Sequence, residues 1–268
     1  MAGVLGNLQG KTAVITGGAS GIGLAMAQRF GAEGMNVVIA DVEQGALDAA
    51  SDLLNDAGIP CAAMRCDVSD RNAVEALADF SYEEFGAVHI LCNNAGVVHR
   101  DLTWEASIES WEWVLGVDLW GPIYGVHSFV PRMLASGEPA HIVNTCSMGG
   151  FLASPMLGAY GATKFAVRAL TESLQYDLQA RDAKVGVSLL APGAVKTAIF
   201  DARTGADADD RVSEGAREMM RQGTAAAGME PADLATEVLA AIREGRYWVF
   251  PHAYMLPAIT ENAAGIVA

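Results

Sequence analysis

The fold of this chain is decided by the stretch Thr12-Ala-Val-Ile-Thr-Gly-Gly-Ala-Ser-Gly-Ile-Gly23. An apolar run over Thr12–Thr16, typical of a buried strand, leads through a glycine-rich turn into a helical pattern over Ile22–Ala32. Glycines at such a turn let the backbone approach a pyrophosphate, which the helix N-terminus attracts through its free N–H groups and dipole. The stretch therefore predicts a dinucleotide-binding unit near the start of the chain.

Short apolar runs and helix-length segments alternate along the rest of the chain. Further strands are expected at Asn36–Ala40, Cys61–Cys66, Val88–Cys92, Ile142–Thr145, Val185–Leu190 and Tyr247–Phe250. Further helices are expected at Gln44–Asp56, Ala73–Phe85, Ser107–Leu119, Ile123–Ala135, Tyr160–Ala180 and Asp233–Arg243. This alternation indicates an α/β fold with a mostly parallel, doubly wound sheet. We expect one domain over residues 1–268, because the sequence contains no internal repeat or linker.

One segment, Thr197–Glu230, departs from this alternation. It is polar and rich in Gly, Ala and Asp, and at most a helix near Arg211–Arg221 is expected in it. A segment of this length inside one domain is usually a lid or binding loop, so we interpret it as a substrate loop. A surface insertion without a role is the alternative.

Composition restricts the class of partner. The net charge of −15 argues against nucleic acid and anionic membrane surfaces, and a soluble acidic surface explains it most simply. No apolar run is long enough to span a membrane, and no signal peptide is evident. The four cysteines form no metal-ligand spacing with the five histidines, so we expect no metal site and a cytoplasmic location.

Asp41 ends the second expected strand, eighteen residues after Gly23. A carboxylate there can accept hydrogen bonds from both hydroxyls of an adenosine ribose and would repel a 2′-phosphate. No Arg or Lys stands in the glycine turn or just after Asp41, so NAD is favoured over NADP. A helix N-cap is the alternative role for Asp41.

Tyr160-Gly-Ala-Thr-Lys164 places a phenol and an ammonium four residues apart on one helix face. A cation beside a phenol lowers its pKa from about 10, which can make a tyrosine a neutral-pH acid or base. Ser147, thirteen residues upstream, could hydrogen-bond a substrate oxygen. Alone the pattern is weak, because chance matches on exposed helices are common.

Together, the glycine turn, Asp41, Asn93-Asn94-Ala95-Gly96, Ser147, the Tyr160–Lys164 pair and Pro192-Gly193 resemble the short-chain dehydrogenase/reductase family over about residues 8–250. This resemblance implies one doubly wound domain with a seven-stranded parallel sheet, commonly assembled as a homotetramer, with a homodimer as the alternative. It also implies NAD(H)-dependent hydride transfer between an alcohol and a ketone, with Tyr160 passing the proton and Ser147 orienting the substrate oxygen. Lys164 would lower the pKa of Tyr160 and bind the nicotinamide ribose.

The resemblance assigns cofactor contacts by position. They are Gly17, Ser20, Gly21, Ile22, Gly23, Asp41, Val42, Asp67, Val68, Asn94, Ala95, Gly96, Tyr160, Lys164, Pro192, Gly193, Val195 and Thr197. Asp67 would contact the adenine amino group, although a strand-end cap is an equal alternative.

Asp118 departs from the pattern, since the family usually carries a catalytic Asn there. A backbone role would survive this change, but a carboxylate has no N–H to donate and adds charge beside Lys164. We expect that the protein is active with an altered pH profile. The alternative is that Asp at this position is tolerated without any effect on activity.

The expected substrate contacts are Ser147, Met148, Gly149, Tyr160, His99 and Phe200. The expected pocket wall, formed by Val97–Arg100, Met148–Phe151, Pro155–Leu157 and residues 197–230, is largely apolar. A hydrophobic secondary alcohol or ketone therefore fits best, and aromatic or polycyclic compounds are candidates. A lone loop histidine such as His99 is more often a surface residue. The tryptophans at 104–120 indicate mainly helix packing, with a pocket or interface role as the alternative.

Two other functions stay open. A non-catalytic NAD-binding regulator or scaffold on the same fold would have no need of the intact Ser147, Tyr160 and Lys164 set. An enoyl reductase resembles a Tyr-x6-Lys spacing, whereas the spacing here is x3.

Overall fold

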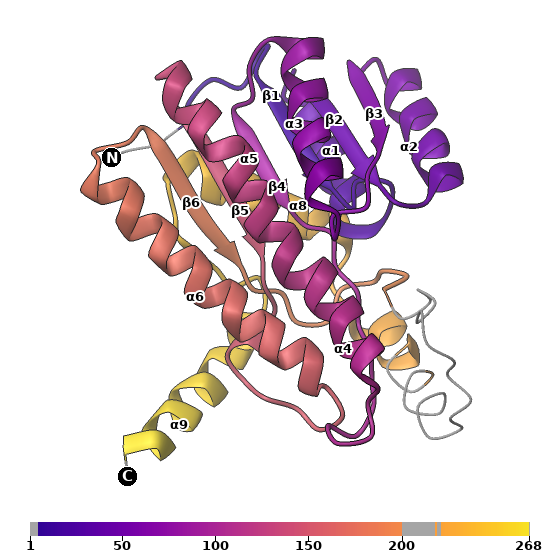
Figure 1. Ribbon diagram of the computed structural model, residues 1–268, viewed down its shortest axis with the longest axis vertical. Helices are drawn as coiled ribbons and strands as arrows, with labels where there is room; N and C mark the ends of the chain where they lie inside the picture. Colours follow the sequence, from indigo (N-terminus) through magenta and orange to yellow (C-terminus); the bar gives the residue numbers. More distant parts are fainter. Residues whose placement is uncertain (1–4, 200–217, 219–220, 268) are drawn as a thin grey trace.

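A sheet of seven parallel strands forms the centre of the protein in the computed structural model, which describes residues 5–199, 218 and 221–267 (Figure 1). The strands are β1 (Thr12–Thr16), β2 (Asn36–Asp41), β3 (Cys61–Arg65), β4 (Ile90–Asn93), β5 (Ala140–Thr145), β6 (Val185–Leu190) and β7 (Trp248–Val249). Their order is β3-β2-β1-β4-β5-β6-β7, and every neighbouring pair is parallel. The predicted doubly wound α/β sheet is confirmed.

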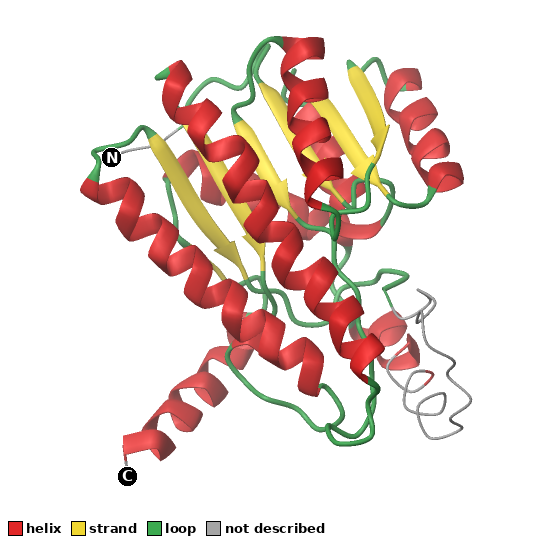
Figure 2. Cartoon of the chain, in the orientation of Figure 1, coloured by secondary structure: helices red, strands yellow, loops and turns green. Residues whose placement is uncertain are grey.

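Helices cover both faces of the sheet (Figure 2). One face is packed by α1 (Gly21–Gly31), α2 (Gln44–Asp56) and α8 (Pro231–Glu244). The other is packed by α3 (Arg71–Phe85), α5 (Gly121–Ser136) and α6 (Gly158–Ala180), with α4 (Ile108–Leu115) beside α6. Along β1, Ala13 and Ile15 join the first core while Val14 joins the second, because successive strand residues point to opposite faces. Burial on both faces explains the continuous apolar strands.

The two helices expected at Ser107–Leu119 and Ile123–Ala135 are joined in the structure. A π-helical turn, Gly116–Trp120, connects α4 to α5, and the N–H of Gly121 donates to the carbonyl of Gly116. Pro122, which has no N–H to donate, lies just after this π turn, which absorbs the proline so that the helix continues through it. This π turn carries Asp118, and such turns often occur at functional sites.

A C-terminal helix, α9 (Leu256–Val267), was not predicted from the sequence. Pro257 and Gly265 obscure its pattern, but a proline in the first helical turn is compatible with a helix. The helix projects away from the sheet (Figure 1), and Ile259 packs against a small core cluster near β6 and β7. No helix in the described part of the chain is long and apolar enough to cross a membrane.

Candidate functional site

A cavity of about 720 Å³ opens along the edge where the parallel strands end. The chain order reverses between β1 and β4, and crevices at such switch points bind ligands in open α/β sheets. Six strand ends contribute to the lining. The lining residues predicted from the sequence are Gly17, Ser20, Gly21, Ile22, Asp41, Val42, Asp67, Val68, Asn94, Ala95, Gly96, Val97, Val98, Asp118, Ser147, Gly149, Leu157, Tyr160, Lys164, Pro192, Gly193, Val195 and Thr197.

The glycine turn after β1 leaves no room for side chains. Gly17 has φ +63°, and a Cβ on it would come within 2.9 Å of the Ala95 backbone. A Cβ on Gly23 would lie 2.0 Å from the Gly17 carbonyl oxygen, which explains why Gly23 packs beneath the turn instead of lining the cavity. Ser20 caps α1 without a side-chain hydrogen bond. Bare backbone and the start of a helix thus face the cavity, which fits a pyrophosphate.

Asn94 connects this turn to the neighbouring strands. Its amide donates to the Thr16 carbonyl at 3.1 Å, and its amide oxygen accepts from the Thr145 hydroxyl at 3.3 Å. The Thr16 hydroxyl in turn accepts from the backbone N–H groups of Asn94 and Ala95. Asn94 therefore joins the ends of β1, β4 and β5.

Asp41 faces the glycine turn from the end of β2. Its carboxylate accepts from the N–H of Ala19 and the N–H of Glu43, both at 3.2 Å. Arg65, at the end of β3, lies nearby and donates from Nε to the Val42 carbonyl at 3.1 Å. The sequence did not reveal this cation, because the pairing of β2 with β3 brings together residues twenty-four positions apart.

Ser147, Tyr160 and Lys164 meet at the other end of the cavity. Ser147 follows β5 and accepts a hydrogen bond from Gly149 N–H at 3.0 Å, whereas Tyr160 and Lys164 share one face of α6. Lys164 Nζ lies 5.4 Å from the centre of the Tyr160 ring. Burial raises the pKa of Tyr160, and Asp118 adds to this shift, whereas Lys164 and a hydrogen bond with Ser147 oppose it. The Lys164 ammonium lowers the pKa of Tyr160, as predicted, but the effect of burial is larger and the pKa stays raised.

Asp118 and Lys164 form a buried ion pair. Asp118 Oδ2 lies 3.1 Å from Lys164 Nζ, and Oδ1 accepts from the Val97 N–H at 2.8 Å. Lys164 also donates to the Thr145 carbonyl at 3.2 Å. Burial disfavours the ammonium, but attraction to Asp118 and Tyr160 outweighs it and raises the pKa of Lys164. Burial likewise raises the pKa of Asp118, against the pull of Lys164.

Some predicted substrate contacts lie elsewhere. The structure does not bring His99 to the cavity lining, and Met148 is buried beneath it. Phe151 packs against Trp248 and Phe250 in a small core. Phe200 lies outside the described residues. Ala198 and Ile199, from the expected 197–230 wall, line the cavity. Trp113 on α4 and Val117 in the π turn also line it, although neither was among the expected substrate contacts or the expected pocket wall.

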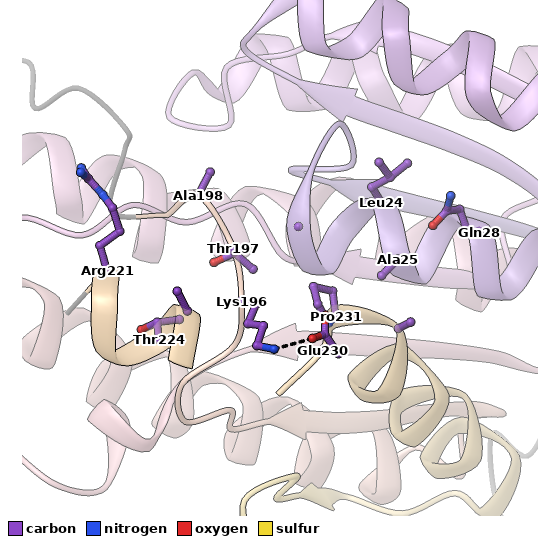
Figure 3. Close-up of a pocket in the computed structure, with 13 residues that line it drawn as sticks. Leu24, Ala25, Gln28, Lys196, Thr197, Ala198, Arg221, Thr224, Glu230 and Pro231 are labelled. Carbon is purple, nitrogen blue, oxygen red and sulfur yellow. Dashed lines mark hydrogen bonds and ion pairs between the residues drawn. The ribbon is translucent and has the colours of Figure 1, made fainter. Parts of the chain in front are cut away.

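A second pocket of about 650 Å³ adjoins the cavity and lies between α1 and residues 221–232 (Figure 3). It shares Gly21, Thr197, Ala198 and Thr224 with the first cavity. Lys196 and Glu230 form an ion pair of 2.6 Å there, next to a parallel bridge between Val195 and Met229. The two ends of the expected 197–230 loop therefore lie side by side, and residues 200–217, 219 and 220 lie outside the described part.

The fold and the cavity define a Rossmann-type α/β protein with a tyrosine–lysine pair lining the cavity at the strand ends. Residues 11–207 match the family model of the short chain dehydrogenases. The chain belongs to the short-chain dehydrogenase/reductase family.

Known proteins of this family resemble the chain over most of its length. It is 40% identical to 1-deoxy-11-beta-hydroxypentalenate dehydrogenase of Streptomyces exfoliatus, over 77% of this chain and 76% of the relative. It is 36% identical to the NADP-dependent (R)-specific alcohol dehydrogenase of Lentilactobacillus kefiri, over 81% and 82%. A short chain dehydrogenase/reductase from Burkholderia phymatum, solved in complex with NAD, superimposes with a TM-score of 0.92 at 40% identity, covering 96% of this chain and 94% of that one.

Proposed function

We propose that the protein is an NAD(H)-dependent oxidoreductase that interconverts a hydrophobic secondary alcohol and its ketone. The observation that carries the proposal is one continuous cavity, lined by the bare glycine turn and Asp41 at one end and by Ser147 and Tyr160 at the other. A bound dinucleotide is long enough to extend from one end of this cavity to the other. When bound, it supplies the acceptor for the hydride that leaves the carbinol carbon.

The side chains of this site would handle the oxygen and the proton. Ser147 would hydrogen-bond the substrate oxygen, and Tyr160 as phenolate would take the hydroxyl proton while the carbon–oxygen bond becomes a carbonyl. Lys164 would stabilise the phenolate by its charge. Ketone reduction would run the same path backwards, with Tyr160 donating its proton to the oxygen.

The choice of NAD rests on Asp41. Its carboxylate lies at the end of β2 beside the glycine turn, where it would accept from ribose hydroxyls and repel a 2′-phosphate. Arg65, whose Nε donates to the Val42 carbonyl, would favour a phosphate, so the preference for NAD depends on the carboxylate of Asp41. The relatives include both an NAD complex and an NADP-dependent enzyme, so the preference is a property to be measured for this chain.

The substrate class rests on the apolar wall near Ser147 and Tyr160. It is formed by Val97, Val98, Leu157 and Ile199. Of the lining carboxylates, Asp41, Glu43 and Asp67 lie at the ends of β2 and β3, which β1 and β4 separate from β5. The remaining one in the described part of the chain, Asp118, is buried in its ion pair with Lys164. An apolar ketone, for which aromatic and polycyclic compounds are candidates, would bury its surface against this wall. The 197–230 segment would cover it as a substrate loop.

The test is absorbance at 340 nm with a panel of secondary alcohols, sugars and hydroxy acids, each with NAD and with NADP. We expect turnover of hydrophobic alcohols with NAD. Turnover only of sugars or hydroxy acids would refute the substrate class, and faster turnover with NADP would refute the cofactor preference. Light scattering would test the expected assembly into a homotetramer or a homodimer.

A non-catalytic NAD-binding regulator is the second candidate. The observation that favours it is the ion pair with Asp118, which occupies the ammonium that Tyr160 would need. Binding of NAD without turnover of any alcohol or ketone at any pH would support it.

A further inference from the structure

A histidine outside every predicted motif holds the turn formed by Pro192, Gly193 and Ala194, which follows β6 and lines the cavity. His252 lies between β7 and α9 and is only 6% exposed. Its Nδ1 accepts from the Gly193 N–H at 3.0 Å, and its Nε2 lies 3.0 Å from the Ala194 carbonyl oxygen. A carbonyl can only accept, so Nε2 carries the proton and the neutral ring uses both its donor and its acceptor.

The opposite side of the same turn contacts the residues of the reacting end. The Pro192 carbonyl accepts from the Met148 N–H at 2.9 Å and from the Ser147 hydroxyl at 3.5 Å. The turn therefore lies between His252 and Ser147. A shift of the turn would change both the cavity wall and the hydrogen bonding of Ser147.

The histidine ring also packs directly against the turn. A Cβ on Gly193 would come within 3.1 Å of the His252 ring and 3.0 Å of Met255 Sδ. The ring contacts Tyr254 edge to face, with the centroids 5.8 Å apart. Close packing and two hydrogen bonds therefore hold the turn against the C-terminal segment.

We propose that His252 is a positioning residue that fixes the 192–194 turn, and through it the nicotinamide half of the cofactor pocket and Ser147. This inference rests on the proposed NAD-dependent function. The adenosine half of the pocket is built by Gly17 in the turn after β1, Gly21 at the start of α1 and Asp41 at the end of β2, and none of these is a hydrogen-bond partner of His252. Loss of His252 should therefore weaken binding of the nicotinamide half selectively.

The test compares binding of NAD with binding of ADP-ribose, which keeps the adenosine and pyrophosphate but lacks the nicotinamide, by isothermal titration calorimetry. In His252→Leu we expect the Kd for NAD to rise roughly three- to tenfold, the size of one or two lost hydrogen bonds, with that for ADP-ribose changed less than twofold. His252→Gln, whose amide offers a donor and an acceptor, should restore part of the NAD affinity. The matched control is Tyr254→Ala, which removes the ring contact but keeps both hydrogen bonds and should leave both Kd values unchanged.

Equal weakening of NAD and ADP-ribose in His252→Leu, or no change in either, would overturn the inference while leaving the proposed function intact. If the parent protein bound neither ligand, the proposed function would fail and the inference with it. If His252→Leu did not fold, His252→Asn would replace it, because its shorter amide can reach Gly193 but not also Ala194. For His252→Asn too, equal weakening of NAD and ADP-ribose, or no change in either, would overturn the inference.

Discussion

Asp118 and Lys164 form a buried ion pair of 3.1 Å at the point where the π turn faces α6. Asp118 is fully buried, and its second oxygen is occupied by the Val97 N–H. A buried pair of this kind is weakly stabilising overall, but removal of one partner leaves a costly unpaired charge. The ion pair and the bond from Val97 hold the Asp118 carboxylate in place. Its charge raises the pKa of Tyr160 and so opposes the effect of Lys164.

Replacement of Asp118 by Asn should shift the pH profile of alcohol oxidation to lower pH. The carboxylate raises the pKa of Tyr160, and oxidation needs the phenolate, so removal of the charge lets the phenolate form at lower pH. The measurement is log(kcat/KM) against pH for Asp118→Asn and the parent. Asp177→Asn, on the exposed face of α6, is the control and should not move the curve. Superimposable curves for Asp118→Asn would contradict the prediction.

Tyr160→Phe should abolish most turnover while leaving cofactor binding intact. The substitution removes only the hydroxyl that passes the proton, and general acid–base catalysis contributes roughly 10²- to 10⁴-fold. Steady-state kcat and the Kd for NADH, measured by fluorescence, separate the two effects. An unchanged kcat would show that Tyr160 is not the proton-transfer residue.

Asp41→Asn should weaken NAD binding and relax discrimination against NADP. A neutral amide accepts a weaker hydrogen bond than a carboxylate, which is worth about 1 kcal/mol, and it no longer repels a 2′-phosphate. Arg65, which lies beside Val42, would then favour the phosphate. The ratio of kcat/KM for NAD and NADP is the measurement. A ratio that stays at the parental value would argue that Asp41 acts only as a backbone cap.

Gly23→Ala should destabilise the protein and impair dinucleotide binding. The new Cβ would lie 2.0 Å from the Gly17 carbonyl oxygen, so the turn must shift, at a cost of about 1–3 kcal/mol. Gly45→Ala is the matched control, because Gly45 lies in α2 with open space around its Cβ position. That control should raise stability by up to about 1 kcal/mol. Thermal unfolding with and without NAD measures both, and equal stabilities of the two variants would refute the prediction.

Thr171→Val should lower stability by about 1–3 kcal/mol. The Thr171 hydroxyl donates to the Val167 carbonyl and accepts from buried Asn144, whose amide N–H would lose this partner. Thr236→Val on α8 is the control, since its exposed hydroxyl makes the same bond to a helix carbonyl but accepts from no buried side chain. Urea unfolding measures both variants. Similar losses in the two would show that the bond to Asn144 contributes nothing.

Much of the fold follows from local patterns. The strands around Val14 and Val38 are apolar throughout because both faces are buried, and the glycine turn before α1 is recognisable because only glycine fits there. The helix boundary at Pro122 was misplaced, because a π turn absorbs the proline. Helix α9 was missed, because Pro257 and Gly265 resemble breaks in the pattern.

The sequence by itself determined the alternation of strands and helices, the glycine turn, and the spacing that puts Tyr160 and Lys164 on one helix face. These features depend on neighbours within a few residues, so local geometry is sufficient. Only the tertiary structure decided that Asp118 pairs with Lys164, that burial keeps the pKa of Tyr160 high, and that His252 holds the turn at Gly193. Each of these depends on the packing of segments distant in the chain, which no local pattern encodes.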